Sequence, residues 1–175
     1  STIAQRFGLS AADLAEFNAL SDPNKIRVGQ LLSIPTTTVV TATTRTTKPS
    51  IIWPVEGPIS SPYGWRIHPI TKKKALHTGV DIGAPHGAKI ISAGAGIVIY
   101  SGWYGAYGNA VIIDHGNGIS TLYGHMSSRA VSTDQAVVPG QVIGYVGSTG
   151  WSTGPHLHFE VRKDGVPVDP MTYFR

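Results

Sequence analysis

The sequence predicts a mainly β protein, in which a domain built from an antiparallel β-sheet or sandwich follows a small α+β unit. Beyond Ile51 the apolar residues fall in short runs with no helical periodicity. Glycine accounts for 21 residues, and charged residues make up 14% of the chain, below the roughly 25% of ordinary soluble domains. Turn signals such as Gly116-Asn117-Gly118 separate the apolar runs. These observations favour short strands joined by tight turns.

The α+β unit comes first and comprises residues 1–35. Its opening apolar residues share one helical face up to Gly8, and Ser10 begins a capping box that starts a second helix. Residues 28–34 predict a strand. A unit of this size buries too little surface to be stable alone. Its sequence, SxIAxRFGLSxxDLxxFNxLxDPNxIxVGQxLxIP, resembles a LysM module, which implies binding of glycans that contain N-acetylglucosamine. The first strand of that family is missing before Ser1, so we expect a partial module.

An extended linker is predicted for residues 36–50, because this segment is rich in Thr, Val and Ala and has no amphipathic period. The second domain then comprises residues 51–175. Its predicted strands, in chain order, are 89–92, 96–100, 110–114, 119–123, 142–146 and 156–162. The segments Gly116–Gly118 and Asp164–Gly165 have the composition of tight hairpin turns. Strands joined by such turns are antiparallel.

The last predicted strand has the clearest alternation. One face carries His156, His158 and Glu160, and the other carries Leu157, Phe159 and Val161. We expect the apolar face to join the core and the polar face to form a site. The Cα atoms of His156 and His158 would lie about 7 Å apart. One metal ion could therefore hold one ring while the other ring reaches the water beside the ion.

Charge and composition limit the partners and ligands of this chain. The net charge of +4 favours a polyanionic neighbour, such as nucleic acid, an acidic membrane surface or a cell wall. The only basic run, Lys72–Lys74, lacks the interleaved aromatic residues of a single-strand binding groove, so we expect no nucleic-acid partner. No apolar run reaches the roughly 18 residues that span a bilayer, and no signal peptide is present. Because the chain has no cysteine, a metal must be held by imidazole and carboxylate groups.

The histidines supply such groups, and there are seven of them. His77 and Asp81 are four residues apart, which on a flat strand would separate them by about 13 Å. Both can bind one ion only if the backbone bends between them, and Gly79 is the residue that would allow the bend. Two imidazoles and one carboxylate leave one open position on a tetrahedral Zn²⁺, as in catalytic zinc sites. The HExxH motif is absent, so the base must come from elsewhere, and His125 and His156 are the candidates.

Several motifs together are more specific than any single spacing. The segments SPYGWRIHP, HTGVD, YGNAVIIDHGNG, TLYGHM and STGPHLHFEV resemble the lysostaphin and LytM class of zinc endopeptidases over residues 55–170. The resemblance implies a LytM-type fold, known as the duplicated hybrid motif. It also implies that His77, Asp81 and His158 bind Zn²⁺, and that His125 and His156 are the catalytic pair. It does not distinguish which histidine of the pair is the base.

The function implied is a zinc-dependent metalloendopeptidase that hydrolyses peptide crosslinks of bacterial cell-wall peptidoglycan. Stem peptides would be the substrate, and glycan would bind through the LysM module. We expect an exported monomer in the periplasm, the cell envelope or the extracellular space. The alternative is a catalytically silent, LytM-like regulator that binds the wall and activates amidases, because relatives with a decayed metal site act in that way. Here no expected ligand is missing.

Other polar residues have more than one interpretation. His68 in the segment RIHP could line the groove or approach the metal, or it could be an ordinary loop residue. Glu160 is expected to hydrogen-bond within the sheet, and His115 is expected to cap the turn before Gly118. Some aromatic residues of glycine-rich loops could either pack or line a groove. They are Trp103, Tyr104, Tyr107 and Trp151.

Overall fold

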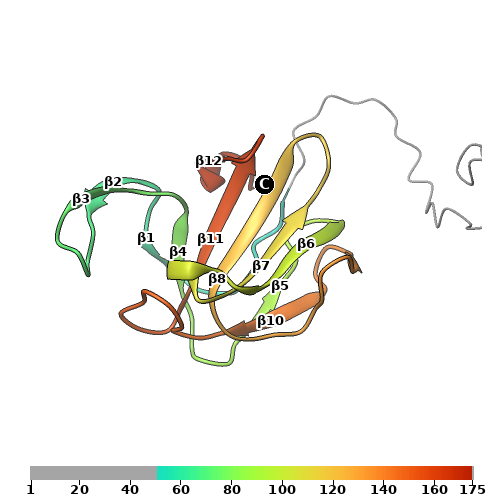
Figure 1. The fold of residues 1–175 in the computed structure, drawn as a ribbon, viewed down its shortest axis with the longest axis horizontal. Coiled ribbons are helices and arrows are strands. Elements are labelled where there is room, and N and C mark those ends of the chain that lie inside the picture. Colours follow the sequence, from blue (N-terminus) through green and yellow to red (C-terminus); the bar gives the residue numbers. More distant parts are fainter. Residues whose placement is uncertain (1–50, 175) are drawn as a thin grey trace, which may run out of the picture. The chain divides into compact units, whose positions relative to one another are not determined.

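The computed structural model describes residues 51–174, which fall within the compact unit Thr47–Arg175 (Figure 1). The partial LysM module and the linker predicted above lie outside the described residues. Between residues 51 and 174, no helix has the length and apolar character needed to cross a membrane.

The described chain is built almost entirely from short strands. They are β1 (Ile59–Ser61), β2 (Gly64–Ile67), β3 (Lys74–His77), β4 (Val80–Gly83), β5 (Lys89–Ile91), β6 (Gly96–Trp103), β7 (Asn109–Asp114), β8 (Ile119–Arg129), β9 (Ala136–Val137), β10 (Val142–Val146), β11 (His156–Lys163) and β12 (Val166–Val168). Two 3₁₀ turns complete the elements, η1 (Gly105–Tyr107) and η2 (Pro170–Thr172). The mainly β fold class is therefore confirmed.

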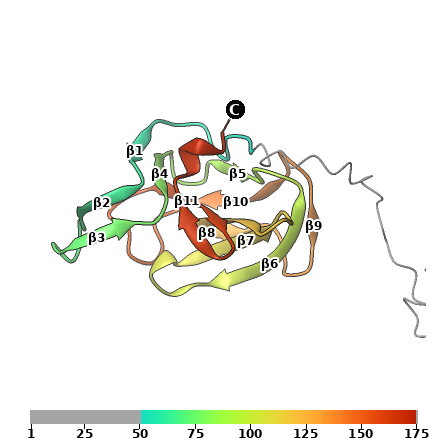
Figure 2. The same cartoon turned by 90° about the horizontal axis from the view of Figure 1, so that it is seen from above.

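Ten of these strands form one sheet, whose main order is β1-β4-β11-β8-β7-β6-β9 (Figures 1 and 2). β10 pairs with β5 and β8, and β12 pairs with β11. β2 and β3 form a separate two-stranded ribbon that projects from the sheet. Every pairing between these described strands is antiparallel, as predicted. The long strands β8 and β11 lie side by side at the centre.

The core lies on the apolar face of β11. Leu157, Phe159 and Val161 are all fully buried. The Phe159 ring packs against Tyr123 of β8, with a distance of 5.3 Å between ring centroids. This packing fixes the backbone of β11 on its apolar face, so the histidines on its other face extend from a rigid strand.

The six predicted strands correspond to β5, β6, β7, β8, β10 and β11, and Gly116–Gly118 forms the predicted hairpin between β7 and β8. β8 is longer than predicted and continues to Arg129. The strands that sequence reasoning missed are β1 to β4, β9 and β12, with between two and four residues each. Strands this short contain too few residues to display an alternating pattern.

The predicted bend near Gly79 is present. β3 ends at His77 in the ribbon, and β4 begins at Val80 in the large sheet, so the chain changes sheets at Thr78 and Gly79. A Cβ atom added at Gly79 would lie 2.3 Å from the carbonyl oxygen of Phe159. Only glycine allows β4 to start this close to β11.

Candidate metal centre

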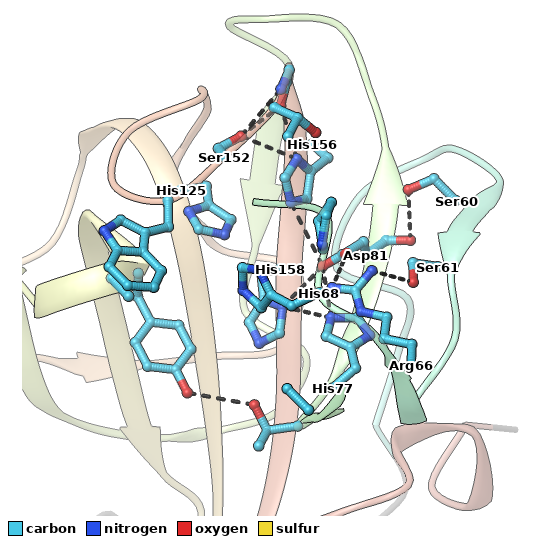
Figure 3. A pocket seen from close by; sticks show the side chains of 18 of the residues that line it. Ser60, Ser61, Arg66, His68, His77, Asp81, His125, Ser152, His156 and His158 are labelled. Carbon is cyan, nitrogen blue, oxygen red and sulfur yellow. Dashed lines mark hydrogen bonds and ion pairs between the residues drawn. The ribbon is translucent and has the colours of Figure 1, made fainter. Parts of the chain in front are cut away.

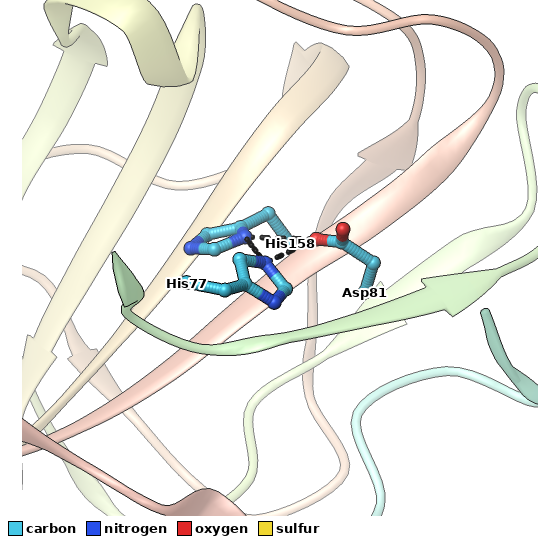
Figure 4. A group of neighbouring side chains, drawn as sticks. All are labelled: His77, Asp81 and His158. Atoms are coloured by element: carbon cyan, nitrogen blue, oxygen red, sulfur yellow. Dashed lines mark hydrogen bonds and ion pairs between the residues drawn. The ribbon is translucent and has the colours of Figure 1, made fainter. Parts of the chain in front are cut away.

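Three predicted ligands converge in one buried cluster (Figure 4). His77 Nε2 lies 3.1 Å from Asp81 Oδ1 and 3.1 Å from His158 Nδ1, and the latter two atoms are 2.9 Å apart. The three residues are between 5% and 8% exposed. The structure thus brings His77, Asp81 and His158 together, the three residues for which the resemblance implied zinc binding.

Strand register produces this convergence. His158 of β11 pairs directly with Asp81 of β4, so their side chains leave the sheet at the same level. His77 arrives from the ribbon because of the change of sheet at Gly79, and it pairs with Gly64 of β2. Its side chain therefore approaches the cluster from the side instead of lying along β4.

The geometry of the cluster fits a tetrahedral Zn²⁺. Ligand atoms bonded at about 2.0–2.1 Å to such an ion lie about 3.3 Å from each other. The separations in the cluster, 2.9–3.1 Å, are only slightly shorter. The donor set of two imidazoles and one carboxylate is also that of many catalytic zinc sites.

Hydrogen bonds behind the cluster determine which nitrogen of each ring faces it. His77 Nδ1 lies 2.7 Å from the carbonyl oxygen of Pro62, and His158 Nε2 lies 3.1 Å from Glu160 Oε1. Both partners can only accept hydrogen bonds, so both outer nitrogens carry the proton. In the neutral rings, His77 Nε2 and His158 Nδ1 are therefore left as acceptors. A cation placed between these atoms and Asp81 would satisfy all of them at once.

Charge in the cluster favours such a cation. Burial by itself would raise the pKa of Asp81, but hydrogen bonds and charge interactions with His158 and His77 bring this pKa well below its usual range. Burial alone would lower the pKa of His158, yet its hydrogen bonds to Asp81 and Glu160 raise it. The cluster thus attracts positive charge: a proton on His158 Nδ1, which then donates to Asp81, or a metal ion in place of that proton.

Asp81 is oriented by two groups that sequence reasoning did not assign. Arg66 Nη2 of β2 lies 3.3 Å from Asp81 Oδ2, and the Ser60 hydroxyl donates to the Asp81 carbonyl over 3.2 Å. Because Arg66 holds Oδ2, while Ser60 holds the main chain, Oδ1 is left directed at the cluster. Arg66 lies within the SPYGWRIHP segment, where it alternates with the exposed Trp65 and Ile67 on β2. The available signal was its position inside this motif.

His125 and His156 lie beside the cluster on adjacent walls of the site (Figure 3). Their rings are 4.8 Å apart between centroids, and the His125 ring is 5.9 Å from that of His158. His156 Nε2 is 3.6 Å from Asp81 Oδ1. The structure therefore brings all five predicted site residues into one group.

Both of these rings are also oriented by backbone carbonyls. His125 Nδ1 lies 2.7 Å from the carbonyl oxygen of Thr149, and His156 Nδ1 lies 2.8 Å from that of Gly154. Each Nδ1 therefore donates, and each Nε2 is free to accept a proton.

His125 has an unusual backbone and a shifted pKa. Its φ of 60° lies in the left-handed region, where a non-glycine residue carries strain of about 1–3 kcal/mol and marks a functional position in many proteins. Burial lowers the pKa of His125 to about 4, helped by the charges of His156 and His158, although the bond to Thr149 opposes this shift. The ring is consequently neutral at pH 7.

A cavity of about 490 Å³ opens over these residues. The ribbon β2–β3 forms one wall, and the loop before β11 forms another, through residues that include Arg66, Ala75, Trp151 and Ser152. This space is large enough for a segment of peptide. Tyr107 and Trp151 line the cavity, which answers the question that sequence left open for these two aromatic residues.

His68 lies at the tip of the ribbon and also lines the cavity. Its Nδ1 accepts from the backbone N–H groups of Ile70 and Thr71, each over 3.2 Å, and its ring meets Trp151 edge-on at 6.1 Å. His68 therefore organises the turn and the groove wall.

His115 does not cap its turn, contrary to expectation. Its ring bonds to the Ala95 carbonyl and to Thr121, while the Asp114 carboxylate accepts from Gly116 N–H over 2.9 Å. A carboxylate next to the turn reaches its N–H groups directly, and the longer imidazole reaches across to β8 instead.

With the geometry established, we compared the chain with known proteins. Residues 75–170, more than half of the chain, match the model of Peptidase family M23, and residues 1–35 match that of the LysM domain.

Curated relatives differ in how much of their own length this chain covers: about a quarter for two of them and three quarters for a third. The chain is 50% identical over 114 residues to the DD-carboxypeptidase/endopeptidase Mpg of Neisseria meningitidis serogroup B (strain MC58), which covers 65% of this chain and 26% of that protein. It is 37% identical over 121 residues to the murein hydrolase activator EnvC of Escherichia coli K12, covering 69% of this chain and 28% of that protein. It is 32% identical over 190 residues to the uncharacterized lipoprotein YgeR of Escherichia coli K12, covering 98% and 75%. The chain thus spans about a quarter of the Neisseria relative.

Solved structures agree with this assignment. A zinc-containing peptidase from Vibrio cholerae is 37% identical, with a TM-score of 0.66 over 71% of this chain and 40% of that chain. The catalytic domain of lysostaphin from Staphylococcus simulans is 30% identical, with a TM-score of 0.61 over 67% and 91%. The lysostaphin-like fold inferred from the motifs is therefore confirmed, and the chain belongs to Peptidase family M23.

Proposed function

We propose that this protein is a zinc-dependent metalloendopeptidase that hydrolyses peptide crosslinks of bacterial peptidoglycan. The observation that carries the proposal is the buried convergence of His77 Nε2, Asp81 Oδ1 and His158 Nδ1, with all three atoms presented as acceptors. Three protein ligands leave a position open, which distinguishes a catalytic zinc site from a structural one. All three ligands come from one chain, so the site is compatible with a monomer.

The proposed chemistry divides the work between the metal and the two neighbouring histidines. His77, Asp81 and His158 would hold Zn²⁺, which would supply the Lewis acidity that polarises a peptide carbonyl and lowers the pKa of water toward about 7. His125 and His156 each present Nε2 to the same space, and their Nδ1 protons are held by backbone carbonyls. One of them takes a proton from the attacking water, and the protonated ring returns a proton to the leaving amine. His125 is available for the first task because its lowered pKa keeps it neutral at pH 7.

The substrate is proposed from the relatives and from the N-terminal segment. The Neisseria relative is named a DD-carboxypeptidase/endopeptidase, and it matches this chain over 114 residues at 50% identity. The match of residues 1–35 to the LysM domain supports binding to the glycan of the same wall. A cell-wall substrate implies a protein exported from the cytoplasm, in the periplasm, the cell envelope or outside the cell. The lipoprotein relative is consistent with such a location.

Digestion of purified peptidoglycan tests the proposal. Mass spectrometry of the released muropeptides should show crosslinked dimers converted to monomers by the full chain. A chelator should abolish the conversion, and added Zn²⁺ should restore it. A His77→Ala variant serves as the matched control, because it removes one ligand and should remain inactive when Zn²⁺ is added. Conversion that is indifferent to both chelator and zinc would refute the metal-dependent mechanism.

One relative supports a second candidate function, a wall-binding activator of other hydrolases. The murein hydrolase activator EnvC is 37% identical to this chain. The intact ligand cluster favours the enzyme, because an activator needs no open metal position. The same digestion decides between them: an activator would release nothing by itself but would stimulate a purified amidase, whereas the endopeptidase would cleave crosslinks alone.

A further inference from the structure

Glu160 is a buried carboxylate that the proposed chemistry does not use. It lies on β11, two residues after His158 on the same face, and its side chain is 0% exposed. Sequence reasoning expected it to serve only the hydrogen bonding of the sheet. From its contacts we infer that Glu160 is a positioning residue, which fixes the orientation of the His158 ring so that Nδ1 is presented to a metal ion. This inference rests on the proposed metal site.

Each carboxylate oxygen of Glu160 has its own set of donors. Oε1 receives hydrogen bonds from His158 Nε2 at 3.1 Å and from the Tyr107 hydroxyl at 2.8 Å, and it is also in contact with the Thr78 hydroxyl. Oε2 accepts a hydrogen bond from Arg162 Nε over 2.7 Å and forms an ion pair with Arg162 Nη2, also at 2.7 Å. Burial of a carboxylate is costly unless such partners are present. Arg162 therefore neutralises the charge, which leaves Oε1 available for the histidine.

The arrangement constrains the His158 ring in two directions. Oε1 holds the ring edge at Nε2, and the Tyr107 ring lies 5.4 Å from the His158 ring at an angle of 50°. Because Tyr107 also donates to Glu160, the same carboxylate aligns both groups. A histidine that binds metal through one nitrogen needs an acceptor at the other, and such outer partners typically change metal affinity by about 10- to 100-fold.

Glutamine cannot replace this carboxylate, although its shape is the same. Its amide has one accepting oxygen and one donating nitrogen. If the oxygen faces His158, the –NH₂ group meets the donors of Arg162. If the amide is reversed, the –NH₂ group meets the His158 Nε2–H. One pair of donors is opposed in either case, so Glu160→Gln disturbs the ring or the ion pair that supports it.

The test compares zinc affinity with the stability of the metal-free protein. In the full chain at pH 7, competition with a chromophoric chelator should show Glu160→Gln binding Zn²⁺ about 10- to 100-fold more weakly than the wild type. Its visible spectrum with Co²⁺ should also change. Thr121→Val is the matched control: Thr121 is a buried polar residue of β8 whose hydroxyl contacts Tyr123 and His115, away from the cluster. It should lower stability and leave zinc affinity unchanged.

Each outcome supports or overturns the inference. A Glu160→Gln variant that is less stable without metal yet binds Zn²⁺ and Co²⁺ like the wild type would give Glu160 a structural role only. If that variant does not fold, Tyr107→Phe decides, because it removes one hydroxyl and no charge. It should weaken zinc binding by about fivefold, as expected for one hydrogen bond, and unchanged affinity would overturn the inference. Failure of the wild type to bind zinc would instead refute the proposed function.

Discussion

The glycine at the change of sheets allows a sharp test of how the metal cluster is assembled. A Cβ atom at position 79 would lie 2.3 Å from the Phe159 carbonyl oxygen and 2.9 Å from Glu160 Cγ. An ordinary contact begins near 3.4 Å, so Gly79→Ala requires β4 and β11 to separate by 3.4 − 2.3, or about 1 Å, at this point. The first of these atoms belongs to the main chain and the second to a buried side chain, so neither can rotate away from the added Cβ atom.

The expected magnitude follows from that displacement. Overpacking of this kind costs about 1–3 kcal/mol in the free energy of unfolding. The displaced segment lies between His77 and Asp81, and it faces the strand that carries His158. A displacement of about 1 Å is large beside the length of a zinc–ligand bond, which is about 2 Å. A metal site requires placement within about 0.5 Å. We therefore expect zinc affinity to fall at least about tenfold.

The assay pairs urea denaturation of the metal-free protein with competition for Zn²⁺ against a chelator. Gly83→Ala is the matched control on the same strand, because its Cβ would meet nothing closer than 3.8 Å, at the Pro58 carbonyl oxygen. It should leave both measurements close to those of the wild type. If Gly79→Ala behaves like Gly83→Ala, the close approach of β4 and β11 does not determine the ligand geometry, and the reasoning is wrong.

Three further predictions concern the cluster, the neighbouring His125 and the core. His77→Ala should reduce bound zinc, measured by elemental analysis of the purified protein, to a small fraction of the wild-type content, because two ligands hold the ion poorly; full content would contradict the assignment. The pKa of His125 is lowered to about 4, so between pH 6.5 and 4 the unfolded metal-free chain binds a proton that the folded chain does not. The wild type should therefore lose about 3 kcal/mol relative to His125→Gln as the pH falls through this window, and urea denaturation at several pH values should show it. Phe159→Ala should cost about 3–5 kcal/mol in the same assay at pH 7, because the ring is fully buried, and a cost below about 1 kcal/mol would contradict its place in the core.

Much of this site could be predicted from short-range patterns. The alternation of β11 is visible in the sequence because the strand is long, and it separates Leu157 and Phe159 from His156 and His158. The spacing of His77 and Asp81 required a bend, and the glycine between them identified its place. The LytM-like motifs then supplied a role for His125, which spacing alone could not provide.

Other features could not be read from local sequence. β4 is four residues long and pairs on both sides with strands distant in the chain, so it has no recognisable pattern of its own. β8 extends past Tyr123, and within this extension His125 has a positive φ. Histidine as a residue type does not predict such a backbone conformation. Glu160 and Arg162 were visible on β11, but their connection to His158, Tyr107 and Thr78 depends on contacts across the sheet.

By itself, the sequence determined the kind of fold and the chemical groups at the site, because hydrophobic alternation and residue type are local properties of the chain. Only the tertiary structure decided which nitrogen of each histidine faces the cavity. That choice depends on acceptors such as the carbonyl oxygens of Pro62, Thr149 and Gly154 and the carboxylate of Glu160. Every residue has a backbone carbonyl, so residue type does not reveal which ones will meet a ring. Strand register and the break at Gly79 place them, and these are long-range consequences of packing.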